Sequence, residues 1–181
     1  VALLARSSAE RINILAYSCG SPLLASALAR LRARHPQEGR AELAKRYRIG
    51  NVMFAASDVD FKTFAHQDVP PILDLAQQLI IYASRNDRAL GFSSLISGAS
   101  RLGKPDIADL SPRELERLAA DPRLQAIDVS DVRGAHEMGG MRGQEPAEVT
   151  VVLDATHDAL ERAYGAGAAK TVREVTVNFG R

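Results

Sequence analysis

The sequence has little cysteine, few aromatic residues and no long hydrophobic run. Its 181 residues include one cysteine and no tryptophan, and 5% of them are aromatic. The lone Cys19 cannot form an internal disulfide, which excludes a disulfide scaffold as well as a zinc site built from cysteines. No stretch approaches the ~20 consecutive apolar residues of a membrane-spanning helix, so we expect no membrane span.

A large net charge is also absent. The chain has 23 basic and 22 acidic side chains, a net charge of +1, so the whole molecule has no field that would gather nucleic acid. The charge is uneven, because residues 1–48 hold nine Lys or Arg against three Asp or Glu. We interpret this excess as a solvated helix face and loop and expect no nucleic-acid partner.

What remains is the composition of one globular domain over residues 1–181, with the placement of residues 137–181 left open. Apolar residues make up 46% of the chain and charged residues 25%, and a chain of this length can bury a single core without metal or disulfides. The lone thiol fits a reducing compartment, which favours the cytoplasm. The chain begins Val-Ala-Leu-Leu without an initiator Met, which we interpret as a fragment or a processed chain.

Strand-like and helix-like segments alternate along the chain. Near-continuous apolar runs, typical of strands buried on both faces, occupy residues 12–17, 51–56, 79–83 and 124–129. Helical spacing or helix caps occur in residues 23–31, 71–78, 88–96 and 111–120. Short connections between strands and helices predict a parallel sheet with right-handed crossovers, and therefore a three-layer α/β domain.

The last third of the chain has weaker patterns. Residues 149–153 predict a strand and residues 155–164 a helix, while residues 175–179 alternate as in a half-buried strand. Residues 134–146 are rich in Gly and Met and predict a loop.

The first chemical signal is Ala16-Tyr17-Ser18-Cys19-Gly20, a variant of G-x-S-x-G that follows an apolar strand and precedes an amphipathic helix. In such an elbow the sharp turn lifts the Ser hydroxyl clear of the sheet and aims the next amide at a developing oxyanion. Small residues flank the turn because strand and helix pass closely there. The alternative is an ordinary strand-to-helix turn without chemistry.

With these residues in view, the sequence resembles a bacterial α/β-hydrolase family formerly catalogued as a domain of unknown function. The resemblance covers residues 3–136, and its segments are residues 16–20, 51–60 (NVMFAASDVD), 82–90 (YASRNDRAL) and 101–103 (RLG). Tyr17 stands where members usually have His. The resemblance implies an α/β-hydrolase fold and a serine hydrolase of the carboxylesterase or lipase type, acting on a small-molecule ester without a cofactor or metal.

The resemblance also implies a triad in the order Ser, Asp, His, which is Ser18, Asp87 and His136 here, with the Cys19 amide in the oxyanion hole. In such a triad the His takes the Ser proton while the carboxylate fixes the tautomer of the His. The parallel sheet brings these residues to one edge, because sites assemble beyond the carboxyl ends of parallel strands.

The acid and the base both have alternatives. Asp58 follows the preceding strand and is the second candidate acid, and Asp87 could instead cap the helix that begins at residue 88. His157 is the alternative base, although it falls in a predicted helix. Of the other two histidines, His35 precedes a proline at a helix end, and His66 has no obvious partner. The spacing of the four histidines argues against a metal site.

Only eleven residues precede the elbow strand, whereas the full fold places several strands there. We therefore expect a sheet that lacks its N-terminal strands and leaves the elbow strand as an exposed edge, which favours self-association. The second oxyanion amide would be missing too, at a cost of about 100 to 1,000-fold in rate. The alternative function is a catalytically inactive α/β-hydrolase-like fragment that serves assembly or partner binding.

Overall fold

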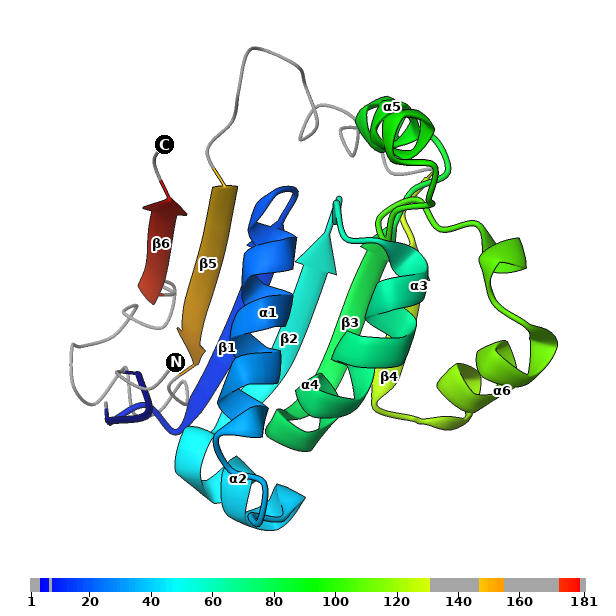
Figure 1. Ribbon diagram of the computed structural model, residues 1–181. Coiled ribbons are helices and arrows are strands. Elements are labelled where there is room, and N and C mark those ends of the chain that lie inside the picture. The colour runs from blue at the N-terminus through cyan, green and yellow to red at the C-terminus, as the bar shows by residue number, and fades with distance from the viewer. Residues whose placement is uncertain (1–3, 7, 131–146, 155–172, 180–181) are drawn as a thin grey trace.

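The computed structural model describes residues 4–6, 8–130, 147–154 and 173–179. Its centre is a six-stranded sheet in the order β4-β3-β2-β1-β5-β6 (Figure 1). The strands are β1 (Arg11–Tyr17), β2 (Ile49–Ala55), β3 (Ala76–Ala83), β4 (Leu124–Asp128), β5 (Ala147–Asp154) and β6 (Arg173–Phe179). β1 to β4 run parallel, as the alternating pattern predicts. β5 is added antiparallel beside β1, and β6 is added antiparallel beside β5.

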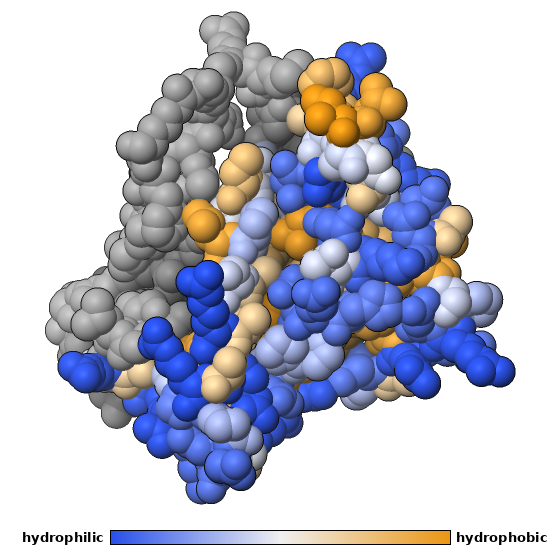
Figure 2. Space-filling view, viewed as in Figure 1, coloured by the Kyte–Doolittle hydropathy of each residue, from blue (hydrophilic) through white to orange (hydrophobic). Residues whose placement is uncertain are grey.

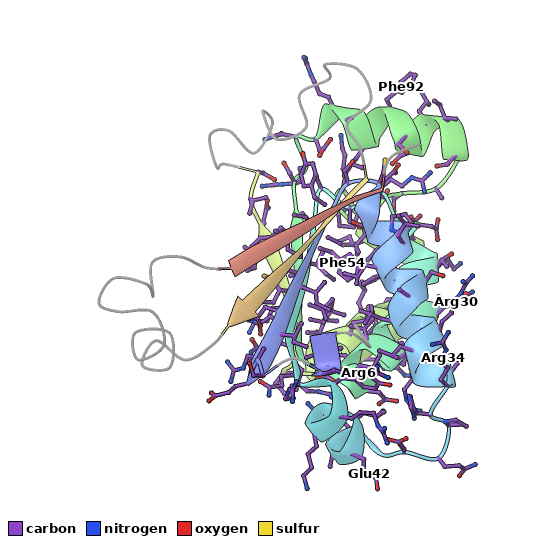
Figure 3. All side chains as sticks on the ribbon, turned by 90° about the vertical axis from the view of Figure 1, so that its left-hand side faces the viewer. Arg6, Arg30, Arg34, Glu42, Phe54 and Phe92 are labelled. Carbon is purple, nitrogen blue, oxygen red and sulfur yellow. The ribbon has the colours of Figure 1, made fainter. Side chains whose placement is uncertain are left out.

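Helices connect the parallel strands. They are η1 (Leu4–Arg6), α1 (Gly20–Ala33), α2 (Arg40–Tyr47), α3 (Phe61–Thr63), the π-helical turn η2 (Phe64–Asp68), α4 (Val69–Leu75), α5 (Arg88–Ser97), η3 (Ile107–Asp109) and α6 (Pro112–Ala120). α1, α3 and α4 lie on one face of the sheet, and α5 lies across the carboxyl ends of the strands (Figures 1 and 3). The predicted α/β class is confirmed, whereas the second helical layer of the predicted three has no counterpart among the described helices. None of those helices is both long and apolar enough to cross a bilayer.

The core fills the space between the sheet and these helices. Ile12 and Ile14 of β1 are at most 1% exposed, as is Leu28 of α1. Phe54 of β2 lies between the sheet and α1 (Figure 3) and meets Phe64 edge-on, with ring centroids 5.1 Å apart. Alternate residues of β1 and β2 therefore anchor the sheet to its helical layer, which fixes where the ends of these strands lie.

One predicted helix boundary is wrong. The pattern predicts a helix over residues 71–78, but α4 ends at Leu75 and Ala76 already begins β3 in an extended conformation. Residues from Ala76 pair with β2 in a parallel register that includes Asn51↔Gln78. The hydrogen bonds and burial of the sheet override the helix propensity of the Ala-Gln-Gln run.

The prediction of an exposed β1 edge is also wrong. β5 pairs antiparallel with the whole of β1, from Arg11↔Asp154 to Tyr17↔Glu148, and β6 pairs with β5 beyond it. The elbow strand is therefore an inner strand, and the reason to expect self-association through its edge is removed. β5 and β6 confirm the strands predicted at residues 149–153 and 175–179. The predicted helix at 155–164 and the predicted loop at 134–146 lie outside the described residues.

The basic excess of residues 1–48 is spread over the end of α1 and over α2. Arg32 pairs with Asp74 at 2.6 Å and Arg46 with Glu38 at 3.0 Å. Arg30 and Arg34 are exposed on the side of α1 away from the sheet (Figure 3). Some of these basic side chains therefore form ion pairs with neighbouring elements, and others form the predicted solvated face.

Candidate functional site

The turn after β1 has the backbone geometry of a nucleophile elbow. β1 ends at Tyr17 and α1 begins at Gly20, so only Ser18 and Cys19 make the turn. Ser18 has φ of 47°, in the left-handed region that non-glycine residues rarely adopt. Its N–H donates to the carbonyl of Ala55 in β2 (3.1 Å), and its carbonyl accepts from the N–H of Ser21 (3.0 Å). Bonds from both sides therefore hold a strained Ser at the end of the strand.

The Ser18 hydroxyl has no catalytic partner among the described residues. Its Oγ approaches the Sγ of exposed Cys19 at 3.9 Å, and no described imidazole or carboxylate bonds to it. Cys19 itself is the N-cap residue of the 14-residue helix α1 and makes no side-chain cap. The unpaired amides and the positive dipole end of a long helix lie at this turn, which favours negative charge there.

Asp87 ends the loop after β3 and caps α5. Its Oδ1 accepts a hydrogen bond from the N–H of Leu90 at 2.9 Å, and the residue is 9% exposed. Its backbone carbonyl accepts from Nζ of Lys104 at 2.9 Å. The capping role is thus present, and it uses one carboxylate oxygen, while Oδ2 has no hydrogen bond from the described residues.

Asp58, the second candidate acid, is engaged by other side chains. Its Oδ1 accepts from the hydroxyl of Ser93 on α5 at 2.7 Å and lies 3.1 Å from Nε of Arg101. The Arg101 N–H is not directed at that oxygen, so this is an ion contact rather than an aligned hydrogen bond. Asp58 therefore ties the loop after β2 to α5 and to residues 100–104.

Residues 100–104, which we call the strap, join the loops after β2 and β3. Gly103 donates its N–H to the carbonyl of Ser57 (2.9 Å), and its carbonyl accepts the N–H of Ser84 (2.8 Å). A Cβ on Gly103 would lie 2.5 Å from the Ser57 nitrogen and 2.8 Å from the carbonyl carbon of Ala56. Only glycine permits this backbone approach. The RLG segment carries part of the family resemblance, but its spacing alone gave no role for it.

Ser130 joins the loop after β4 to the loop after β3. Its hydroxyl accepts the N–H of Arg85 (2.9 Å) and donates to Oδ1 of Asp128, and its carbonyl accepts Nδ2 of Asn86 (3.1 Å). The pKa of Asp128 is lowered because its carboxylate accepts this hydroxyl bond. The sequence pattern gives no signal for Ser130, because its partners Arg85 and Asn86 lie more than 40 residues earlier in the chain.

The strand register fixes the spacing of these loops. Tyr17 of β1 is aligned with Ala55 of β2, and Ala55 is aligned with Tyr82 of β3. With neighbouring strands about 4.8 Å apart, the Ser18 turn and the Asp87 loop begin about 10 Å apart, on either side of β2.

The two candidate bases, His136 and His157, lie outside the described residues. The remaining histidines are engaged away from the elbow. His35 contacts Glu38 through Nδ1 (2.7 Å) and the Tyr47 hydroxyl through Nε2 (2.6 Å). His66, for which the sequence offered no partner, lies 3.1 Å from Glu114. No group of three or more potential metal ligands occurs in the described part of the chain.

A family model described as "Alpha/beta hydrolase of unknown function (DUF900)" matches residues 1–156. The chain belongs to this family. The match spans the elbow, both candidate acids and all four parallel strands, so the α/β-hydrolase resemblance seen in residues 3–136 is confirmed. No curated protein and no solved structure gave a match.

Proposed function

We propose that this member of the α/β-hydrolase family is a serine hydrolase that cleaves carboxylic esters through an acyl-enzyme. Ser18 is the nucleophile, His136 the general base and Asp87 the acid that orients it. The observation that carries the proposal is the left-handed φ of 47° at Ser18, between a strand and a long helix. Strain at a non-glycine residue in that position favours a role for its exposed hydroxyl.

The chemistry proceeds in two displacements. Ser18 Oγ attacks the ester carbonyl carbon while the His takes the hydroxyl proton, and the tetrahedral intermediate then expels the alcohol, which receives that proton. Water next attacks the acyl carbon and gives a proton to the His. The acyl C–O bond to Ser18 breaks, the proton returns to Oγ, and a carboxylic acid leaves. The Cys19 amide, at the N-terminal end of α1, is the proposed oxyanion donor in both steps.

Two contacts favour Asp87 over Asp58 as the acid. Asp58 already faces Arg101 and Ser93, whereas Oδ2 of Asp87 has no hydrogen bond from the described residues. The candidate base His136 comes six residues after Ser130, which bonds directly to the Asp87 loop. Six residues span at most about 20 Å, so the position of the proposed base in the sequence is compatible with a place beside the proposed acid. His157 remains the alternative base.

The decisive experiment is covalent labelling of the full chain with a fluorophosphonate, read by intact mass. We expect one adduct in the wild type and in Cys19→Ala, and none in Ser18→Ala. The matched Cys19→Ala variant separates the hydroxyl from the neighbouring thiol. An adduct that persists in Ser18→Ala would overturn the assignment of the nucleophile.

Hydrolysis of p-nitrophenyl butyrate provides the second readout. We expect turnover that is lost in Ser18→Ala and in His136→Ala, and retained in His157→Ala. Retained turnover in His136→Ala together with loss in His157→Ala would transfer the role of base to His157.

A further inference from the structure

A groove of about 920 Å³ lies beside the Asp87 loop, between α5, the strap and β4. Its volume is within the range of roughly 300–1,000 Å³ that ligand sites in proteins usually have. Ala83 and Arg85, which line it, belong to the end of β3 and to the loop that carries Asp87. The groove is therefore continuous with the proposed acid side of the site.

The walls of the groove are aliphatic. They include Leu95 of α5, Ile107 of η3 and Ile127 of β4, together with small residues such as Ala99 and Ala126. No Phe, Tyr or His is among the described residues that line it. A planar ring would find no aromatic stacking partner here, whereas a flexible hydrocarbon chain gains from burial against such walls.

The charges that line the groove are only partly paired. Among the described residues, the charged ones that line it are Arg85, Lys104, Asp106, Asp109 and Asp128, two basic and three acidic. Arg85 pairs with Asp128 at 3.3 Å, and Nζ of Lys104 donates to the Asp87 carbonyl. A carboxylate or phosphate would meet a net negative charge from these described residues. This balance favours an uncharged occupant.

Three exposed side chains on α5 show which part of the helix faces the groove. Leu95 (80% exposed) lines it, whereas Phe92 (65%) and Ile96 (72%) do not. All three belong to the apolar group over α5 in Figure 2. Because each is mostly exposed, each can be replaced with little disturbance of the core, and Ile96 is a matched control for Leu95.

We propose that this groove binds the aliphatic chain of an uncharged long-chain ester, with the ester group at Ser18. This inference rests on the proposed function and adds the substrate class. The Ser18 turn and the end of β3 begin about 10 Å apart, so with C–C bonds of about 1.5 Å a chain needs about eight carbons to reach the groove. Short esters therefore gain nothing from it.

Binding is tested in the full chain carrying Ser18→Ala, so that no hydrolysis intervenes. The probe is N-dodecyl dansylamide, an uncharged alkyl fluorophore, measured by fluorescence titration. We expect Leu95→Asp and Ile107→Asp to weaken binding at least tenfold, and Ile96→Asp to change it less than twofold. Decanol should displace the probe at least tenfold more effectively than decanoate. Equal weakening by all three variants, or equal competition by the two compounds, would overturn the groove.

Hydrolysis is tested with Ser18 intact, using p-nitrophenyl butyrate and p-nitrophenyl laurate. We expect Leu95→Asp and Ile107→Asp to lower kcat/KM for the laurate about tenfold more than for the butyrate, and Ile96→Asp, outside the groove, to leave both esters unchanged. An equal effect on both esters would contradict the groove.

The two arms separate the two proposals. If the probe binds as expected but no ester is cleaved and Ser18 takes no fluorophosphonate, the proposed function fails. If Ser18 cleaves esters but the groove variants behave like Ile96→Asp, the chain-binding groove fails.

Discussion

The turn after β1 and the loop after β3 are both at the carboxyl edge of the sheet, but they are held in different ways. The Ser18 turn consists of two residues and is fixed by neighbours close in sequence plus one bond to β2. The Asp87 loop is held by the strap and by Ser130, through residues that come 17 to 45 positions later in the chain. The proposed nucleophile is thus positioned by local backbone strain, whereas the proposed acid is positioned by long-range contacts.

This difference predicts that the acid can be changed chemically without loss of structure. Asn is as good an N-cap as Asp, so Asp87→Asn should keep α5 and the fold. We expect kcat for p-nitrophenyl butyrate to fall about 10⁴-fold, as when a triad His is held in the wrong tautomer. Circular dichroism and the melting temperature should remain near the wild type.

Asp58→Asn is the matched control for Asp87→Asn. It weakens the contact with Arg101 and should lower stability slightly while reducing kcat by less than about tenfold, because this carboxylate is given no part in the proposed reaction. The reverse pattern, with full activity in Asp87→Asn and loss in Asp58→Asn, would assign the acid to Asp58.

The elbow was predictable from the sequence because its signal is local. An apolar strand, small flanking residues and an amphipathic helix stand within residues 12–31, and each has a direct physical reason. The Asp87 loop was predictable only in part. Its capping residue can be recognised in the sequence, whereas the strap that holds the loop cannot. Gly103 is one glycine of 13 in the chain, and only its contact with the Ala56–Ser57 backbone explains it.

The order of the sheet was predictable for the parallel strands and not for the tail. Alternation of strand and helix predicts β1 to β4, because each crossover brings the next strand beside the last. No local feature says that residues 147–154 return to the free side of β1. That choice is decided by pairing with a distant strand, which a pattern of alternating residues does not specify.

Gly103→Val tests the strap. The new Cβ would meet backbone atoms at 2.5 and 2.8 Å, so the two loops must separate, and we expect a loss of about 3 kcal/mol or more in the free energy of unfolding. Gly39→Ala is the control, because a Cβ there meets no atom closer than 3.9 Å. Urea denaturation measures both, and equal effects would contradict the role of the strap.

Ser130→Ala should have a smaller effect. It removes the hydroxyl that bonds to the Arg85 amide and to Asp128, and we expect a loss of about 1–2 kcal/mol. The exposed Ser97, whose hydroxyl makes only long bonds of 3.3 to 3.4 Å, provides the control in Ser97→Ala. Denaturation midpoints that are the same for the two variants would show that Ser130 does not brace the loop.

The smallest effect concerns Asp60, which caps α3 in the loop after β2. The pKa of Asp60 is lowered because its carboxylate accepts the Thr63 N–H at 2.6 Å. A carboxylate whose pKa is lowered in the folded state stabilises the fold at pH values above its ordinary pKa, and this stabilisation is lost as the pH falls. We therefore expect the free energy of unfolding to decrease by about 0.3 kcal/mol between about pH 5 and pH 3. Asp60→Asn should remove this part of the pH dependence, as measured by urea denaturation at each pH.

The antiparallel pairing of β5 with β1 has a consequence for folding during synthesis on the ribosome. Each pair in this ladder joins residues more than 130 positions apart in the sequence. The elbow strand therefore acquires its second neighbour only after more than 130 further residues have been made. Because such distant contacts form slowly, the edge of β1 stays open to non-native pairing in the meantime.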